Sequence, residues 1–195
     1  MSIYIIDEKK DRQKEYNWTN ERFDKYNIIC IRNYETLKEI GSHQICQKEN
    51  IVCLHDSFFK NLNLKEKDRE IFDKKLRDIY KYIIFGGGIN FTNITNNVAV
   101  LPVSSFYIHL DSFLKNKEYT LEILVYGENY EKEKKLKLKN MLLEKLFSLK
   151  SKEILSEDMK KDILKTLGND NIIKEILKNN NTVLEIKNIL TQWKI

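Results

Sequence analysis

The sequence predicts an α/β fold: an open, mostly parallel, doubly wound sheet of five to six strands followed by a C-terminal helical tail. Two observations lead to this prediction. Short apolar runs rich in Ile and Val alternate with longer charged segments of helical period, a pattern typical of βαβ units. The apolar runs are continuous rather than alternating, as expected for strands that helices cover on both faces.

Six short runs are predicted to be strands. Polar residues, Gly or Pro bound them, and their lengths suit strands better than buried helices. Pro102, the only proline, closes the fifth run, and Gly127 closes the sixth. The predicted strands are residues 3–6, 28–31, 51–54, 82–85, 98–101 and 121–126.

The segments between and after these strands carry apolar residues at helical spacing. One of them is expected to be interrupted near Gly41, because Gly weakens the interior of a helix. Another begins at Ser156, a favoured N-cap residue, and two acids follow it in the first turn. The predicted helices are residues 9–25, 34–47, 65–81, 106–113, 131–150, 156–167, 171–178 and 182–193.

We expect two domains, an α/β domain over residues 1–150 and a small helical unit over residues 151–195. The net charge of +5 resides in residues 131–195, which hold 15 Lys and 10 Asp or Glu. No Arg follows Arg77, and recognition of phosphates and base edges favours Arg, so the Lys-rich tail is a weak signal for nucleic acid. The last three helices are therefore either a packing or dimerisation element or a helix-turn-helix unit.

The sequence predicts a cytoplasmic protein with no membrane segment. No apolar run reaches the roughly 18 residues of a membrane helix, and the N-terminus lacks a basic leader. The cysteines, Cys30, Cys46 and Cys53, are odd in number and have no CxxC spacing. A zinc site would have to recruit His43 or His55 from across the fold.

Candidate functional residues follow the first and third predicted strands, since ligands of open parallel sheets bind at the carboxyl ends of strands. Asp7 and Glu8 follow the first strand, and His55 and Asp56 follow the third. The carboxylates of Asp7, Glu8 and Asp56 are expected to share a pocket suited to Mg²⁺, which prefers oxygen ligands. The alternative is that Asp7 and Glu8 begin a surface helix and Asp56 caps one, with His55 as a packed or capping residue.

Two further groups are candidates for a ligand-binding loop. Gly86, Gly87 and Gly88 end the fourth predicted strand, and Ser104 and Ser105 follow the fifth. Three glycines permit close approach of the backbone to a phosphate or to a neighbouring loop. Neither GxGxxG nor GxxxxGK[ST] accompanies them, so a nucleotide site is not expected.

This arrangement resembles the receiver domain of bacterial response regulators over about residues 1–118. That family carries an acidic pair after the first strand, matched by Asp7 and Glu8, and a phosphate-accepting aspartate after the third, matched by Asp56. The resemblance implies a flavodoxin-like sheet, Mg²⁺ bound by the acidic groups and a role in signalling. Two family features differ: Gly86 replaces the Thr or Ser that ends the fourth strand, and Leu101 replaces the Lys before the proline.

The sequence therefore predicts a non-enzymatic regulatory or protein-interaction module built on a degenerate receiver-like domain. Its expected partner is another protein or a second copy of the chain, and no cofactor is required. One alternative is a Mg²⁺-dependent phospho-accepting receiver, or a phosphoryl-transfer or hydrolytic enzyme, that uses Asp7, Glu8 and Asp56. The other is a DNA-binding regulator that acts through the Lys-rich tail.

Overall fold

The computed structural model of the protein describes residues 1–195 except 62–65, 148, 151–152, 168–169 and 194–195. The chain divides into two compact units, Met1–Glu128 and Asn129–Ile195. Within the described residues, no helix is both long enough and apolar enough to cross a membrane.

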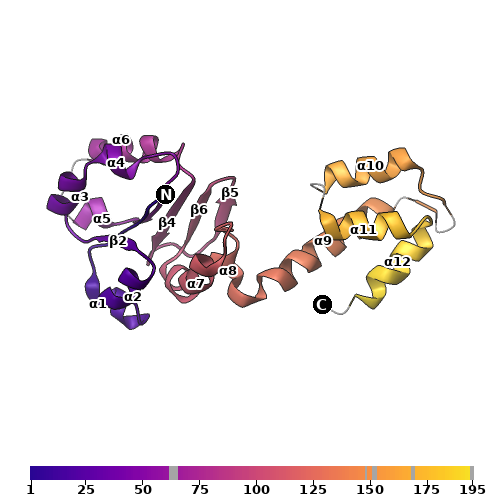
Figure 1. Ribbon diagram of the computed structural model, residues 1–195, viewed down its shortest axis with the longest axis horizontal. Coiled ribbons are helices and arrows are strands. Elements are labelled where there is room, and N and C mark those ends of the chain that lie inside the picture. Colours follow the sequence, from indigo (N-terminus) through magenta and orange to yellow (C-terminus); the bar gives the residue numbers. More distant parts are fainter. Residues whose placement is uncertain (62–65, 148, 151–152, 168–169, 194–195) are drawn as a thin grey trace. The chain divides into compact units, whose positions relative to one another are not determined.

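The described residues of the first unit form a six-stranded sheet of order β2-β1-β3-β4-β6-β5 (Figure 1). All neighbouring pairs are parallel except the edge pair, in which β5 runs antiparallel to β6. The predicted open, mostly parallel α/β fold is thus confirmed. The strands are β1 (Ile3–Ile6), β2 (Ile28–Ile31), β3 (Ile51–His55), β4 (Lys81–Gly86), β5 (Asn93–Thr95) and β6 (Val98–Pro102).

Helices cover both faces of this sheet, because the central strands bury side chains on both sides (Figure 1). On one face Tyr4, Val52 and Tyr82 share a core with α3, α4, α5 and α6. On the other face Phe106 of α7 stacks on Phe85 of β4 with ring centroids 4.0 Å apart, and each such buried ring contributes roughly 1.5–3 kcal/mol. These helices are α1 (Lys10–Glu15), α2 (Asn20–Lys25), α3 (Tyr34–Ile40), α4 (Ser42–Ile45), α5 (Phe58–Asn61), α6 (Glu66–Leu76) and α7 (Val103–Lys115).

The strand predicted at residues 121–126 is wrong. This segment forms the short helix α8 (Ile123–Tyr126), followed by the 3₁₀ turn Gly127–Asn129, and it packs on α7. Leu121 and Leu124 are both buried, at a spacing that suits a helix, and so short an apolar run does not distinguish helix from strand. The sheet gains its sixth strand from β5 instead, a segment that was not predicted. Asn93 and Thr95 of β5 are polar and exposed, so the sequence carries no strand signal there.

Two breaks in the helices follow from single residues. The helix predicted at 9–25 is divided into α1 and α2, and Asn17 between them has a φ of 60°. The interruption predicted near Gly41 is confirmed. Gly41 joins α3 to α4 with a φ of 79°, a left-handed conformation that glycine adopts without steric cost.

The second unit consists, in its described residues, of α9 (Tyr130–Phe147), α10 (Glu157–Thr166), α11 (Asn171–Asn179) and α12 (Val183–Gln192). Leu142 of α9 packs in one core with Ile163, Ile173 and Ile186 of the three later helices. The contacts therefore group α9 with this unit, whereas the sequence analysis placed α9 in the first domain. Ser156 caps α10 as expected, accepting a hydrogen bond from the Met159 backbone N–H at 3.3 Å.

Candidate functional site

The carboxyl ends of β1, β3, β4 and β6 form one rim of the sheet. Ile6 of β1 pairs in register with Leu54 of β3, and Gly86 of β4 pairs with Pro102 of β6. Because the strands are parallel, the residues that follow them emerge on the same edge. Asp7, Glu8, His55, Asp56 and the glycines therefore share this rim.

Asp7 is completely buried, and its carboxylate accepts three hydrogen bonds. Oδ1 accepts from the Lys9 backbone N–H at 3.1 Å and from Arg12 at 2.9 Å, and Oδ2 accepts from the Tyr107 hydroxyl at 2.7 Å. A buried carboxylate requires such bonds, because leaving the charge uncompensated is strongly unfavourable. Burial, together with the negative charge of Asp7, raises the pKa of Tyr107 well above its usual value, so its hydroxyl keeps the proton that it donates.

Arg12 connects Asp7 to Glu8. One guanidinium nitrogen bonds to Asp7, and the other lies 3.8 Å from Glu8 Oε1. The sequence analysis did not identify Arg12 or Tyr107. The spacing of Glu8 and Arg12, four residues apart, was a signal for the first. Tyr107 stands 100 residues from Asp7 in the chain, and nothing in the sequence connects them.

His55, the last residue of β3, is buried at the same rim with only 3% exposure. Its Nδ1 lies 2.9 Å from Ser57 Oγ and 3.5 Å from Asp56 Oδ1. Its Nε2 is also buried and has no hydrogen-bond partner in the described part of the chain, an arrangement that typically costs about 1–3 kcal/mol. Burial lowers the pKa of the imidazole, with a further contribution from Arg12, although the charge of Asp7 opposes it.

Asp56 lies over Gly86, the last residue of β4. Its backbone N–H donates to the Phe85 carbonyl oxygen at 2.9 Å, and its carboxylate is 32% exposed. A Cβ atom on Gly86 would stand 2.3 Å from Asp56 Oδ1, so the absence of a side chain on Gly86 makes room for this carboxylate. The backbone carbonyl of Asp56 accepts a hydrogen bond from Arg69 at 2.9 Å.

The other residues predicted to form a ligand-binding loop lie at the same rim, but the structure does not bring them together into one site. Gly87 and Gly88 have open space where a Cβ would stand. Ser104 and Ser105 are half-buried in the first turn of α7. Oxygen and nitrogen atoms of Asp7, Glu8 and His55, in contrast, lie within 4.8 Å of one another, so these three residues form a cluster that could hold a metal ion.

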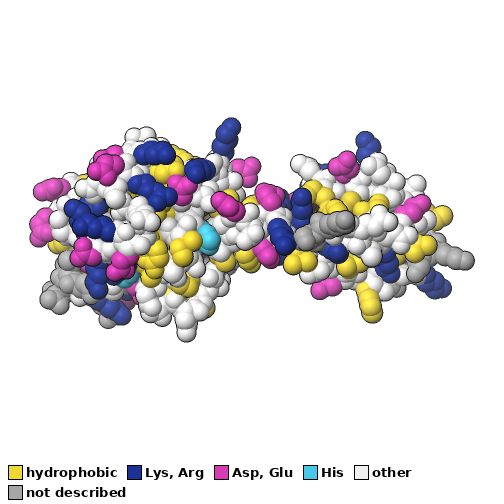
Figure 2. Space-filling view, turned by 90° about the horizontal axis from the view of Figure 1, so that it is seen from below, with side chains coloured by type: hydrophobic (Ala, Val, Ile, Leu, Met, Phe, Trp, Pro, Cys, Tyr) yellow, Lys and Arg dark blue, Asp and Glu magenta, His cyan; other side chains and the backbone are white. Residues whose placement is uncertain are grey.

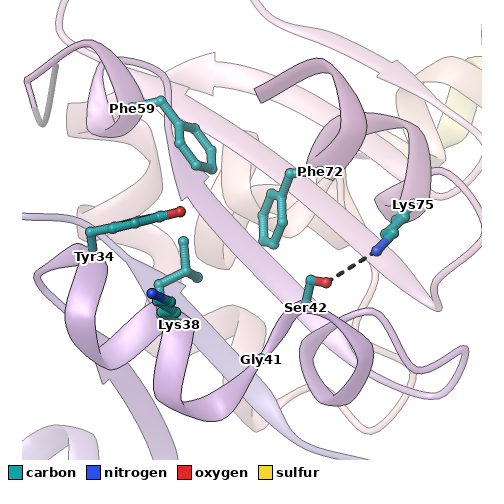
Figure 3. A pocket seen from close by; sticks show the side chains of 8 residues that line it. Tyr34, Lys38, Gly41, Ser42, Phe59, Phe72 and Lys75 are labelled. Carbon is teal, nitrogen blue, oxygen red and sulfur yellow. Dashed lines mark hydrogen bonds between the residues drawn. The ribbon is translucent and has the colours of Figure 1, made fainter. Parts of the chain in front are cut away.

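A separate pocket of about 310 Å³ opens among α3, α4, α5 and α6 (Figure 3). Three aromatic side chains and one leucine supply its apolar wall, and two lysines stand beside them. One of these, Lys75, donates a hydrogen bond to Ser42 Oγ at 3.1 Å. This pocket was not predicted from the sequence, because its apolar side chains have the spacing of ordinary core positions in helices. The lining residues are Tyr34, Leu37, Lys38, Gly41, Ser42, Phe59, Phe72 and Lys75.

On the face shown in Figure 2, the Lys and Arg side chains of the first unit are interspersed with Asp and Glu side chains rather than gathered in one patch. Comparisons of the chain with models of known protein families, with characterised proteins and with solved structures found no match.

Proposed function

We propose that this protein is a non-enzymatic regulatory module. Its α/β unit is a degenerate receiver-like domain that acts by binding another protein or a second copy of the chain. The observation that carries the proposal is the environment of Asp56, the candidate phosphate acceptor. Its carboxylate lies against Gly86, which has no hydroxyl, and in the described residues no Lys or Arg forms an ion pair with it.

This environment is poorly suited to phosphoryl transfer. A phosphoryl group carries negative charge that cations and hydrogen-bond donors must offset in the transition state. Arg12 at the rim is committed to Asp7 and Glu8. Arg69 donates to the backbone carbonyl of Asp56 and forms an ion pair with Asp73. Leu101 stands before Pro102, at the position where a receiver supplies a lysine. A phosphoryl group on Asp56 would therefore lack a cationic side chain from any of these positions.

The pocket between α3 and α6 supports a binding role. Phe59 and Phe72 supply an apolar wall, and the exposed Lys38 and Lys75 stand at its border (Figure 3). None of the described residues that line it is acidic. Ligand pockets are typically apolar with a few orienting polar groups. This combination suits a partner segment with an aromatic or aliphatic side chain beside an acidic one.

A phospho-accepting receiver is the second candidate. The observation that favours it is the exposure of Asp56 at the rim that also holds Asp7 and Glu8. It predicts that acetyl phosphate with Mg²⁺ modifies Asp56 and shifts the oligomeric state. The interaction module predicts neither effect, and mass spectrometry with light scattering distinguishes the two.

The binding role is tested by charge reversal at the pocket. The protein is purified from its native cells under gentle conditions, and co-purifying chains are quantified by mass spectrometry. We expect the Lys38→Glu/Lys75→Glu variant to lose a partner, or its dimer, that the wild type retains. Lys117→Glu, an exposed change on the loop after α7, is the matched control. Equal recovery of every partner and oligomer by all three proteins would refute the role of the pocket.

A further inference from the structure

The rim of the sheet contains a side chain that can bind a metal and that is not among the metal ligands implied by the resemblance to receivers. His55 brings an imidazole to within 4.8 Å of ligand atoms of Asp7 and Glu8. Asp7 and Glu8 directly follow β1, and His55 is the last residue of β3, so the pairing of these two adjacent strands brings the three residues to one edge. Asp56, the third acid predicted to bind metal, is not a member of this cluster.

The Nε2 atom of His55 indicates a ligand. This atom is buried and has no hydrogen-bond partner among the described residues. The whole residue is only 3% exposed, so bulk solvent does not supply a partner either. Buried polar atoms are nearly always satisfied, and an exception requires an explanation such as an ion. A metal bound at Nε2 would satisfy it.

The other ring nitrogen of His55 is already oriented. Nδ1 accepts a hydrogen bond from the Ser57 backbone N–H at 3.3 Å and lies 2.9 Å from Ser57 Oγ and 3.5 Å from Asp56 Oδ1. A metal at Nε2 would use the lone pair of that atom and leave the ring proton on Nδ1, where Ser57 Oγ or Asp56 Oδ1 can accept it in place of the bond from the backbone. Metal-binding histidines usually have such a partner, which fixes the tautomer and the ring orientation. Asp56 and Ser57 are therefore positioning residues in this arrangement.

The carboxylates at the rim also suit a divalent ion. Asp7, Glu8 and Asp56 bring three of them to one edge of the sheet, and Arg12 pairs with Asp7 and Glu8. A carboxylate has about four acceptor sites, and Asp7 uses three of them to accept hydrogen bonds from Lys9, Arg12 and Tyr107. One site on Asp7 therefore remains for a metal.

We infer that Asp7, Glu8 and His55 bind a divalent transition-metal ion such as Zn²⁺. The imidazole selects this class, because Mg²⁺ takes oxygen ligands, whereas imidazole suits Zn²⁺ and related ions. The site goes beyond the proposed binding function and does not depend on it.

The inference is tested on the full-length protein with the metals alone. Zn²⁺ and Mg²⁺ are titrated by calorimetry, Co²⁺ is followed by its visible absorption, and the ¹⁵N shifts of the histidine rings are recorded with and without Zn²⁺. We expect Zn²⁺ and Co²⁺ to bind with one ion per chain, Mg²⁺ to bind far more weakly, and the shift of His55 Nε2 to change.

Variants assign the ligands. We expect His55→Gln and Glu8→Gln to weaken Zn²⁺ binding by more than roughly 100-fold, and Ser57→Ala by roughly 10–100-fold. His43→Gln and Glu15→Gln, the same changes at exposed positions on α4 and α1, should bind as the wild type does. The ¹⁵N measurement needs no variant, so it stands even if a variant fails to fold. Unchanged affinity in His55→Gln, an unmoved Nε2 shift, or equal binding of Mg²⁺ would overturn the inference.

Discussion

Replacing Tyr107 with Phe removes one hydroxyl from the buried carboxylate of Asp7 and leaves the ring in place. The hydroxyl donates to Asp7 Oδ2 at 2.7 Å, and both residues are almost fully buried. A hydrogen bond to a charged group contributes about 1.5–3 kcal/mol. We therefore expect Tyr107→Phe to lower the free energy of unfolding of the first unit by that amount, which moves the urea midpoint down by about 1 M.

The unfolding of the first unit is measured by the fluorescence of Trp18. This indole is 1% exposed and donates a hydrogen bond to the Tyr107 carbonyl oxygen at 2.9 Å, so it reports on the packing of α7. The second tryptophan, Trp193, lies in the other unit and is removed as Trp193→Phe in every sample.

Tyr80→Phe is the matched control for Tyr107→Phe. The Tyr80 hydroxyl also donates a hydrogen bond, to the Glu118 carbonyl oxygen at 3.0 Å, but its residue is 40% exposed and its acceptor is neutral. We expect its removal to cost less than about 0.5 kcal/mol. Equal losses in the two variants would refute the argument that Tyr107 stabilises a buried charge.

Two further predictions concern titratable groups of the first unit. Burial opposes the ionisation of Asp111, but hydrogen bonds from Lys115 and Tyr26 outweigh it and hold its pKa below the usual range. Its stabilising effect is therefore present above the unfolded-state pKa of about 3.9 and is lost as the pH falls toward the folded-state pKa. Urea unfolding at a series of pH values should show a smaller acid-induced loss for Asp111→Asn than for the wild type. Asp158→Asn, a change to a side chain of α10 that is 95% exposed, should show no such difference. Burial raises the pKa of the Cys46 thiol to about 11, so few of its molecules are thiolate at neutral pH. Alkylation of Cys46 by iodoacetamide, followed by mass spectrometry, should be slow in the native protein and accelerate in urea, and a rapid native reaction would contradict this assignment.

Much of the first unit could be predicted from local patterns. The strands at Ile3–Ile6 and Ile51–His55 are continuous apolar runs, and such runs require cover on both faces wherever they occur. The break at Gly41 was equally local, because it follows from the backbone freedom of one residue. The run at 121–126 was misassigned, since its length allows either helix or strand and its burial against α7 decided for helix.

The candidate site was predictable only in part. Asp7, Glu8 and Asp56 were identified because parallel strands bring their carboxyl ends to one edge. His55 was interpreted as a packing residue, and its unsatisfied Nε2 is visible only when its neighbours are in place. The pocket bordered by Lys38 and Lys75 arises from four helices, and no segment of the chain carries its pattern.

The sequence by itself determined the class of the fold, the order of most elements and the acids at the strand ends. Each of these depends on periodicity or on the chemistry of neighbouring residues, and both are written along the chain. Only the tertiary structure decided that Tyr107 and Arg12 hold Asp7, that Asp56 fills the space over Gly86, and that His55 faces the acidic pair. These contacts join residues from different elements, so they exist only once hydrophobic burial has packed the helices on the sheet.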